Sequence, residues 1–345
     1  MQRRLFMHLL GLLLLFAGMS TAQATTTCVF NTAGGVMTLT ADCTTDSTIT
    51  IPNGLTLDGR NYTITAADPV GGHFLGAVVK NEGPIANVVN LRITTAGLSN
   101  ACEAGDNGLR GILFSGVSGT IYGNTISNLY RDAGACPEGY AIEVRNFNTG
   151  GFDPPVQTVE ITSNRVTGFQ KTGIVCDGVV SCLVRSNVVG ASATQAEQPV
   201  NGIQIGYGAG AVVENNDVAG NSWAGGDYYL DPRVSTAILL IDAAPETSVR
   251  HNNLMEGNAD IGIYVYTDGA IIDNNRVYET GEDLNKALWD FGIYVFSQDL
   301  DAEVITTNTI TINKVRGYLF PYNSPELTTQ DGGNNKANPS PAPAK

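Results

Sequence analysis

The sequence predicts an all-β solenoid, and three observations support this prediction. Apolar residues alternate in runs too short for a helix, as between Asn201 and Asn221, where the runs IQI and AVV are separated by glycines. A segment of the form I/V-x-x-N-x-V/I/L recurs along the chain. A second segment, Gly or Ala followed by Ile-x-apolar, precedes its copies. Units of this size cannot bury a core alone, so we expect the copies to stack.

The first repeated segment carries an asparagine at one equivalent position in each copy. The intervals between copies lie within the window of about 20 to 50 residues that is typical of solenoid repeats, and their variation falls in loops. Stacked side-chain amides satisfy one another, so we interpret this position as a structural ladder. The repeat asparagines are Asn124, Asn164, Asn187, Asn216, Asn252, Asn275 and Asn308.

The combination of the two segments, seen in GIVC, GIQI, GIYV, VRSNVV and IDNNRV, resembles the right-handed parallel β-helix proteins. These comprise the pectate-lyase-like superfamily and the repeat modules related to the copper-enzyme maturation protein NosD. The resemblance covers about residues 48–320 and implies a single-domain right-handed parallel β-helix. It says little about activity, because the repeat describes how coils stack.

The N-terminal segment, residues 1–24, has the features of a secretory signal peptide. Arg3 and Arg4 precede an apolar run from Leu5 to Phe16, and Ala22-Gln23-Ala24 supplies small residues for cleavage. The run is too short for a membrane-spanning helix. We therefore expect a secreted or periplasmic protein with no transmembrane segment after signal removal.

Three further segments are expected in the mature chain. Residues 25–47 are expected to form an N-terminal cap, because an uncapped first coil exposes apolar core and an unpaired strand edge. Residues 48–322 are expected to form the β-helix. Residues 323–345, which are rich in Gly, Asn, Pro and Ala, are expected to be a disordered tail.

Six cysteines lie after the signal segment, and their even number indicates disulfides. Fifteen pairings are possible, and the expected coil register narrows them. The pairs expected are Cys176 with Cys182, Cys102 with Cys136, and Cys28 with Cys43. Cys176 and Cys182 are expected to face each other across a turn, and Cys102 and Cys136 to lie in corresponding loops of successive coils. Cys28 and Cys43 remain, in the cap region. The absence of a CxxC pair argues against a metal site.

The chain is acidic, with a formal net charge of −14. Such a surface repels phosphate backbones, so nucleic acid is not expected as a partner, and polyanionic glycans are repelled unless a cation bridges the two. Calcium is the candidate ion, because acidic loop residues could supply oxygen ligands, but no metal site is assigned. The oxygen donors considered are Asp227, Asp231, Asp283 and Asp290. We expect a monomer.

Alternation along the strands places one column of residues outward beside the repeat asparagines. Four consecutive members alternate in charge, and stacking at about 4.8 Å is expected to form an ion-pair ladder that specifies register more than stability. The column runs through Tyr122, Thr162, Arg185, Glu214, Arg250, Asp273 and Thr306.

A second outward column is aromatic. In GIYVY and GIYVF the isoleucine and valine point inward, so the alternate residues point outward from two neighbouring coils. Flat rings suit the apolar faces of sugars, which makes the patch a candidate polysaccharide-binding surface; the alternative is a stack that stabilises neighbouring strands. Its members are Tyr264, Tyr266, Tyr294 and Phe296.

Long insertions fall repeatedly between the N-x-V segment and the next GI segment, so we expect them to emerge along one edge of the solenoid. Both tryptophans, Trp223 and Trp289, lie in these loops. Functional residues concentrate on loops held by a rigid scaffold, so this edge is the candidate site. The insertions are residues 127–139, 190–200, 219–236 and 278–290.

The resemblance implies a chemistry for this edge. Related β-helix enzymes act on uronate polysaccharides by removing a proton next to a carboxylate, which requires a base and a group that neutralises the carboxylate. Two near-matches to the FDPH motif of alginate epimerases begin at Phe152 and Leu230, but both lack its histidine, which argues against epimerase chemistry. Residues of the types needed for catalysis are Tyr229, Asp231, Arg233 and Lys286.

The sequence leaves two functional hypotheses. The first is a secreted β-helix that binds an extracellular polysaccharide along the loop edge and the aromatic face, with cleavage by β-elimination left open. The second is a non-catalytic structural or adhesive solenoid that contacts another protein or the cell surface. A groove with a convergent Arg or Lys and carboxylates favours the enzyme, and a flat face without such groups favours the structural role.

Overall fold

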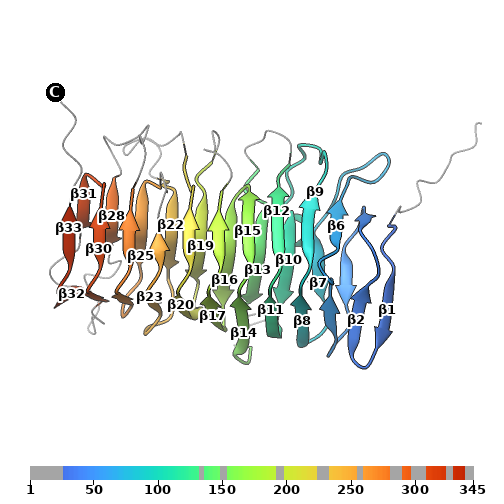
Figure 1. The fold of residues 1–345 in the computed structure, drawn as a ribbon, viewed down its shortest axis with the longest axis horizontal. Helices are drawn as coiled ribbons and strands as arrows, with labels where there is room; N and C mark the ends of the chain where they lie inside the picture. The colour runs from blue at the N-terminus through green and yellow to red at the C-terminus, as the bar shows by residue number, and fades with distance from the viewer. Residues whose placement is uncertain are drawn as a thin grey trace, which may run out of the picture.

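The computed structural model is a right-handed parallel β-helix, as the sequence predicts (Figure 1). Three sheets run side by side along the molecule, and the chain passes from sheet C to sheet A to sheet B before it returns to sheet C. The described residues contain no helix of the length and apolarity needed to cross a membrane. The structure describes residues 26–131, 136–147, 154–191, 198–223, 233–254, 259–279, 290–296, 308–323 and 329–338.

Nearly all regular structure in the described residues is β-strand. Sheet A consists of β1 (Phe30–Ala33), β2 (Val36–Leu39), β5 (Thr56–Asp58), β8 (Ile85–Val89), β11 (Ser118–Tyr122), β14 (Gln157–Thr162), β17 (Val180–Arg185), β20 (Gly210–Glu214), β23 (Ser248–Arg250), β26 (Ile271–Asp273), β29 (Asn308–Thr311) and β32 (Thr329–Gly333). Sheet B consists of β3 (Cys43–Thr45), β6 (Thr63–Ala66), β9 (Arg92–Thr95), β12 (Thr125–Leu129), β15 (Arg165–Phe169), β18 (Val188–Gly190), β21 (Asp217–Ala219), β24 (Asn253–Leu254), β27 (Arg276–Tyr278), β30 (Lys314–Arg316) and β33 (Lys336–Asn338). Sheet C consists of β4 (Ile49–Ile51), β7 (Ala77–Asn81), β10 (Arg110–Ser115), β13 (Tyr140–Asn146), β16 (Thr172–Gly178), β19 (Asn201–Gly206), β22 (Thr236–Ile241), β25 (Ile261–Tyr266), β28 (Phe291–Val295) and β31 (Phe320–Asn323). A short 3-10 helix, η1 (Gly105–Asn107), precedes β10.

The core is one apolar column enclosed by the three sheets. Parallel pairing places like side chains over one another, so that Ile142, Ile174 and Ile203 are consecutive partners in sheet C and are fully buried. Branched side chains pack well on a pleated surface, and burying each one contributes about 1.5 to 3 kcal/mol. The repeated GI and N-x-V segments therefore encode a stack of equivalent layers.

The loop edge expected from the sequence is also present. Each of the four expected insertions connects a strand of sheet B with the next strand of sheet C. β12 ends at the edge that is drawn at the top of Figure 1, and because the sheet B strands are parallel, all four connections begin at that edge. The outer face of sheet C therefore begins directly beside this edge.

The asparagine ladder is confirmed. Oδ1 of Asn216 accepts hydrogen bonds from the backbone N–H and the side-chain amide of Asn187, at 2.9 and 3.0 Å, and Nδ2 of Asn216 donates to the Val184 carbonyl at 2.9 Å. The same contacts repeat from coil to coil, so each amide satisfies backbone groups at the bend between sheets A and B. The ladder runs through Asn124, Asn164, Asn187, Asn216, Asn252, Asn275, Asn313 and Asn335.

The prediction was wrong for the last repeat asparagine. Asn275 donates to Oδ1 of Asn313, whereas the side chain of Asn308 bonds to the Ala270 N–H and to a neighbouring carbonyl. The segments ITTNTI and ITINKV overlap and share one pattern, so the sequence offers two registers. The bend before the asparagine falls at Ile312, with φ 57°, a conformation that is unfavourable for a β-branched residue and that the sequence therefore does not suggest.

The β-helix also extends further at both ends than expected. β2 and β3 pair in parallel with β5 and β6, so coils begin at Val36, inside the segment expected as a cap, and β1 adds an antiparallel strand at the end of sheet A. β32 and β33 pair in parallel with β29 and β30. The helix therefore continues to Asn338, inside the segment expected as a tail.

The three expected disulfides are present. Their Cα–Cα distances are 4.9 Å for Cys28–Cys43, 5.0 Å for Cys102–Cys136 and 6.7 Å for Cys176–Cys182. The second joins the connections that precede β10 and β13, and the third spans the turn between β16 and β17. Each bridge thus ties together elements that the coil register already brings close.

The charged column on sheet A has the expected register over its four charged members. Glu214 lies 3.7 Å from Arg185 and 2.8 Å from Arg250, with Asp273 next in the column. The member predicted to follow Asp273 in this column was wrong, because Thr311 rather than Thr306 pairs with Asp273. Thr306 itself lies outside the described residues. Both arginines are more than a third exposed, so each pair contributes only about 0 to 1 kcal/mol.

We predict that Asn216→Ala destabilises the fold by roughly 2 to 4 kcal/mol, because it leaves the Asn187 N–H and the Val184 carbonyl buried without a partner. The free energy of unfolding, measured in urea, tests this. Asn31→Ala, which changes an exposed asparagine of β1, is the control and should change stability by less than about 0.5 kcal/mol. Equal effects of the two substitutions would contradict the structural role of the ladder.

Candidate functional site

The outer face of sheet C changes in character along the helix axis. Parallel register arranges its outward side chains in columns, which are polar near the N-terminal end and apolar or aromatic near the C-terminal end. One column runs through Lys80, Leu113, Glu143, Val175, Gln204, Leu239, Tyr264 and Tyr294. The next column runs through Ser115, Arg145, Asp177, Gly206, Ile241 and Tyr266.

The polar cluster, defined as Lys80, Asp106, Arg110, Glu143 and Arg145, is a connected network of ion pairs. Glu143 is paired with Arg110, and its other oxygen lies 3.5 Å from Arg145. Asp106, which belongs to η1, is paired with Arg145 and lies 3.2 Å from the Lys80 ammonium. The hydrogen bond from Arg145 holds the pKa of the Asp106 carboxyl below its usual value. The cluster therefore joins three neighbouring strands and η1 through alternating charges.

Asp177 lies beside the polar cluster in the column of Arg145, and its side chain is largely buried. Nε2 of Gln204 donates to its Oδ1 at 3.4 Å. Burial raises the pKa of the Asp177 carboxyl to about 7; the Gln204 hydrogen bond opposes this effect, and the charge of Glu143 adds to it. Asp177 therefore retains its proton at mildly acidic pH and can donate a hydrogen bond there.

A pocket of about 450 Å³ opens at the polar end of this face. It combines the Arg145 guanidinium, the Asp106 carboxylate and the ring of Phe147, which is 47% exposed. An exposed ring beside paired charges can contact both the apolar face and the hydroxyl groups of a sugar. The lining residues are Asp106, Ser115, Gly116, Arg145, Asn146, Phe147 and Pro154.

The predicted two-by-two arrangement of aromatic rings is confirmed at the other end of the face. The ring centroids of Tyr264 and Tyr294 are 5.3 Å apart, as are those of Tyr266 and Phe296. Phe291 extends the group, with its centroid 4.9 Å from that of Tyr294. Burial raises the pKa of Tyr264, so its hydroxyl remains a hydrogen-bond donor. The aromatic patch consists of Tyr264, Tyr266, Phe291, Tyr294, Phe296 and Phe320.

At the loop edge the structure brings together two residues proposed from the sequence. The Arg233 guanidinium lies 5.4 Å from the centroid of the Trp223 ring. Trp223 is only 3% exposed, so it supports Arg233 and does not offer a free ring to a ligand. Lys171, immediately before β16, donates from Nζ to the Pro199 carbonyl at 3.0 Å. Burial, with a smaller effect of Arg233, lowers the pKa of Lys171 to about 8.

The other loop residues proposed from the sequence lie outside the described residues, so their placement stays a prediction. They are Tyr229, Asp231, Lys286 and Trp289, together with the calcium donors Asp227 and Asp283. Asp290 is described, and its Oδ2 accepts the Leu319 N–H at 2.9 Å. That contact gives Asp290 a structural role at the start of β28.

Sequence reasoning missed the polar cluster, Asp177 and Lys171. The missed signal was in the GI strands themselves, because AIEVR and GIVCD already place Glu143, Arg145 and Asp177 at outward positions. Lys171 carries no such signal, because its surroundings include residues distant in sequence, such as Pro199 and Arg233.

Metal binding has little support among the described residues. The group of side chains close enough to hold an ion is Cys102, Cys136 and Glu138. The two sulfurs are joined in a disulfide, so they are not available as thiolate ligands. Calcium therefore stays a prediction that concerns the loop carboxylates alone.

Comparisons with known proteins agree with the fold. A family model described as a right-handed β-helix region matches residues 154–335. The search of curated proteins returned no significant match. Among solved structures, the Dettilon tailspike protein gp208 is 16% identical with a TM-score of 0.43, and the alignment covers 79% of this chain and 54% of the tailspike chain.

Two epimerase structures are also similar. The periplasmic alginate epimerase AlgG is 11% identical with a TM-score of 0.39, over 83% of this chain and 73% of that chain. The A-module of the mannuronan C-5 epimerase AlgE6 from Azotobacter vinelandii is 12% identical with a TM-score of 0.30, over 86% of this chain and 92% of that chain.

We predict that Asp177→Asn flattens the dependence of stability on pH. The folded protein holds the Asp177 proton up to about pH 7, whereas an unfolded aspartate loses it near its ordinary pKa of 3.8. The folded state thus binds more protons between these values, so stability falls as pH rises through that window, by at most about 1.4 kcal/mol per pH unit. Urea unfolding between pH 4 and 8 measures this slope.

The control is Asp217→Asn, which changes an exposed carboxyl on sheet B. A change in slope shared by both variants would show that the change does not come from the Asp177 site. A profile for Asp177→Asn that stays parallel to that of the wild type would show that Asp177 titrates as an ordinary carboxyl.

Proposed function

This chain belongs to the right-handed β-helix family, and on that scaffold we propose that it binds a polysaccharide along the outer face of sheet C. The observation that carries the proposal is the aromatic patch. Its rings project from neighbouring strands, which lie about 4.8 Å apart, and Phe296 is 42% exposed. Exposed groups of aromatic side chains are typical of binding surfaces, and their flat faces suit sugar rings.

The polar end of the same face supports the proposal because it supplies hydrogen-bond donors and acceptors. The polar cluster and the pocket beside it supply guanidinium donors and carboxylate acceptors, and Asp177 adds a protonated carboxyl below about pH 7. A linear polymer laid along the helix axis would contact the aromatic patch with one part and the polar cluster with another. This arrangement joins stacking with orientation by polar groups, as ligand sites do.

Cleavage of the bound polymer is a second candidate function, and Lys171 favours it. β-Elimination of a uronate needs a base that takes the proton beside the carboxylate while the glycosidic C–O bond breaks. A lysine whose pKa is about 8 is partly neutral at slightly alkaline pH, and Arg233 beside it can neutralise the substrate carboxylate. In this proposal Lys171 joins Arg233, with Tyr229, Asp231 and Lys286 as further loop residues.

We propose that the protein is exported and acts in the periplasm or outside the cell. Three disulfides fit an oxidising compartment, and the signal peptide expected from residues 1–24 fits export. The alternative, a non-catalytic solenoid that contacts another protein, fits the architectural ladders equally well. It gives no reason for partly exposed aromatic rings on the same face as a polar pocket, so we prefer polysaccharide binding.

We predict that the double substitution Tyr264→Ala and Tyr294→Ala lowers affinity for the bound polysaccharide at least tenfold, because the stacking surface is removed. Affinity electrophoresis in gels that contain pectic, alginate or neutral glycans measures retention. The matched control is Tyr122→Ala, which removes an exposed tyrosine from sheet A and should leave retention unchanged. Retention unaffected by the double substitution would reject the aromatic patch as the binding surface.

We also predict that any unsaturated product formed from uronate polymers increases as pH rises through about 8, because only neutral Lys171 can accept a proton. Absorbance of the new double bond follows the reaction, with and without calcium. Lys171→Gln and Arg233→Gln should each lower the rate at least a hundredfold, while glycan retention changes little. Retention of glycan with no product at any pH would make the protein a binding module.

A further inference from the structure

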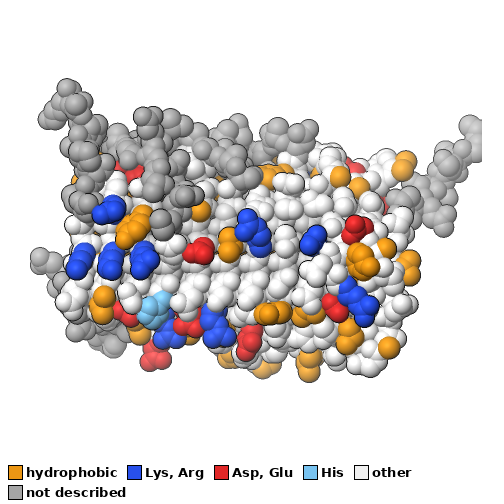
Figure 2. Space-filling model, viewed as in Figure 1, with side chains coloured by type: hydrophobic (Ala, Val, Ile, Leu, Met, Phe, Trp, Pro, Cys, Tyr) orange, Lys and Arg blue, Asp and Glu red, His pale blue; other side chains and the backbone are white. Residues whose placement is uncertain are grey.

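A row of cations lies on the outer face of sheet B near its C-terminal end. Arg276, Lys314 and Lys336 are consecutive partners in β27, β30 and β33, and all three are exposed. Arg316 is exposed two residues beyond Lys314, with its guanidinium 5.7 Å from the centroid of the Tyr278 ring. Blue side chains accordingly gather over β30 and β33 in Figure 2. We call these four residues the basic row.

The basic row differs from the charged columns on sheets A and C, because the described residues form no ion pair with it. The chain carries 33 acidic and 19 basic residues, and the charged columns on sheets A and C pair arginines with carboxylates. Within the part of the chain that the structure describes, none of the four members forms an ion pair. Like charges about 4.8 Å apart repel one another, so the row is unfavourable unless an anion neutralises it.

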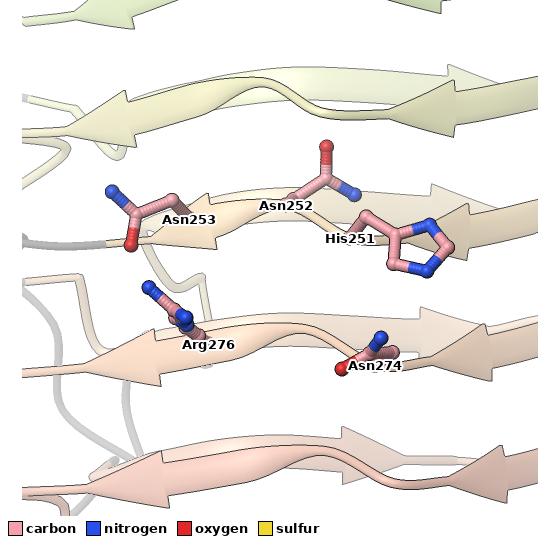
Figure 3. A pocket seen from close by; sticks show the side chains of 5 residues that line it. All are labelled: His251, Asn252, Asn253, Asn274 and Arg276. Carbon is pink, nitrogen blue, oxygen red and sulfur yellow. The ribbon is translucent and has the colours of Figure 1, made fainter.

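A polar pocket of about 210 Å³ adjoins the basic row at Arg276. In Figure 3, Arg276 and Asn253 lie on neighbouring coils at one end of the pocket, and His251 and Asn274 lie at the bend toward the other end. The described lining residues offer guanidinium, imidazole and amide donors and include no carboxylate. The lining residues are His251, Asn252, Asn253, Asn274 and Arg276.

We propose that the basic row and this pocket bind a linear anionic polysaccharide whose carboxylate or sulfate groups contact successive cations. The row follows a single strand position along the helix axis, and Asp217, two strands before Arg276 in the same column, bounds it. A narrow row with a fixed spacing matches a polymer chain better than a planar surface. The pocket is placed to receive an anionic substituent at the end of the row.

This site goes beyond the proposed function. It lies on a different sheet from the aromatic patch and depends on charge rather than on stacking. The rest of this acidic protein repels polyanions. A polyanion would therefore approach the protein in one orientation, toward the basic row. The row would thereby hold an anionic polymer independently of any contact on sheet C.

The test compares two double variants with equal changes in charge. Lys314→Gln with Lys336→Gln should weaken binding of polygalacturonate or dextran sulfate at least tenfold at about 50 mM salt, where screening is modest. Arg92→Gln with Arg165→Gln, which removes two exposed cations from the same sheet B column nearer the N-terminus, should change binding less than twofold. Lys314→Arg with Lys336→Arg should retain binding. Wild-type binding should weaken strongly at about 500 mM salt.

Further arms separate this proposal from others. The two polymers distinguish carboxylate from sulfate as the preferred group, and neutral dextran should not bind the row. Lys314→Gln with Lys336→Gln should leave retention of neutral glycans unchanged, so failure of the aromatic patch and failure of the basic row are read separately. Equal losses in the two double variants, no polyanion binding by the wild type, or binding only to vesicles of anionic lipid would each overturn the proposal.

Discussion

The structure depends on the register that the stacked asparagines fix between coils. Each ladder amide occupies the bend between sheets A and B and satisfies the backbone of the preceding coil, as Asn216 does for Asn187 and Val184. Buried polar groups are costly when unpaired, so a shift of one residue anywhere in the stack would break these contacts and turn the apolar side chains outward. The ladder therefore sets the position of every other column.

The outward columns of side chains follow from this fixed register. Because equivalent positions lie over one another, substitutions at outward positions create continuous columns without disturbing the core. Sheet A carries an ion-pair ladder around Glu214, and sheet C carries the polar cluster and the aromatic patch. Sheet B carries a row of cations that form no ion pair with the described carboxylates. The same scaffold thus presents three chemically distinct faces.

The sequence predicted the features that repeat and missed those that depend on a single place in the fold. Alternation and the repeated asparagine were sufficient to predict the parallel β-helix, the loop edge, the disulfide pairs and the ring pairs such as Tyr264 with Tyr294. The exception was Asn308, where two overlapping copies of one pattern differed only in register. The properties of Asp177 and Lys171 arise from burial by residues distant in sequence, which no local pattern records.

In the proposed function a polysaccharide lies along the outer face of sheet C. A crystal structure of the protein soaked with an oligosaccharide that it retains in solution tests this placement. We expect sugar density over Tyr264 and Tyr294 that continues toward Arg145 and Asp177. Sugar density confined to another face, with the rings of the aromatic patch uncovered, would contradict it.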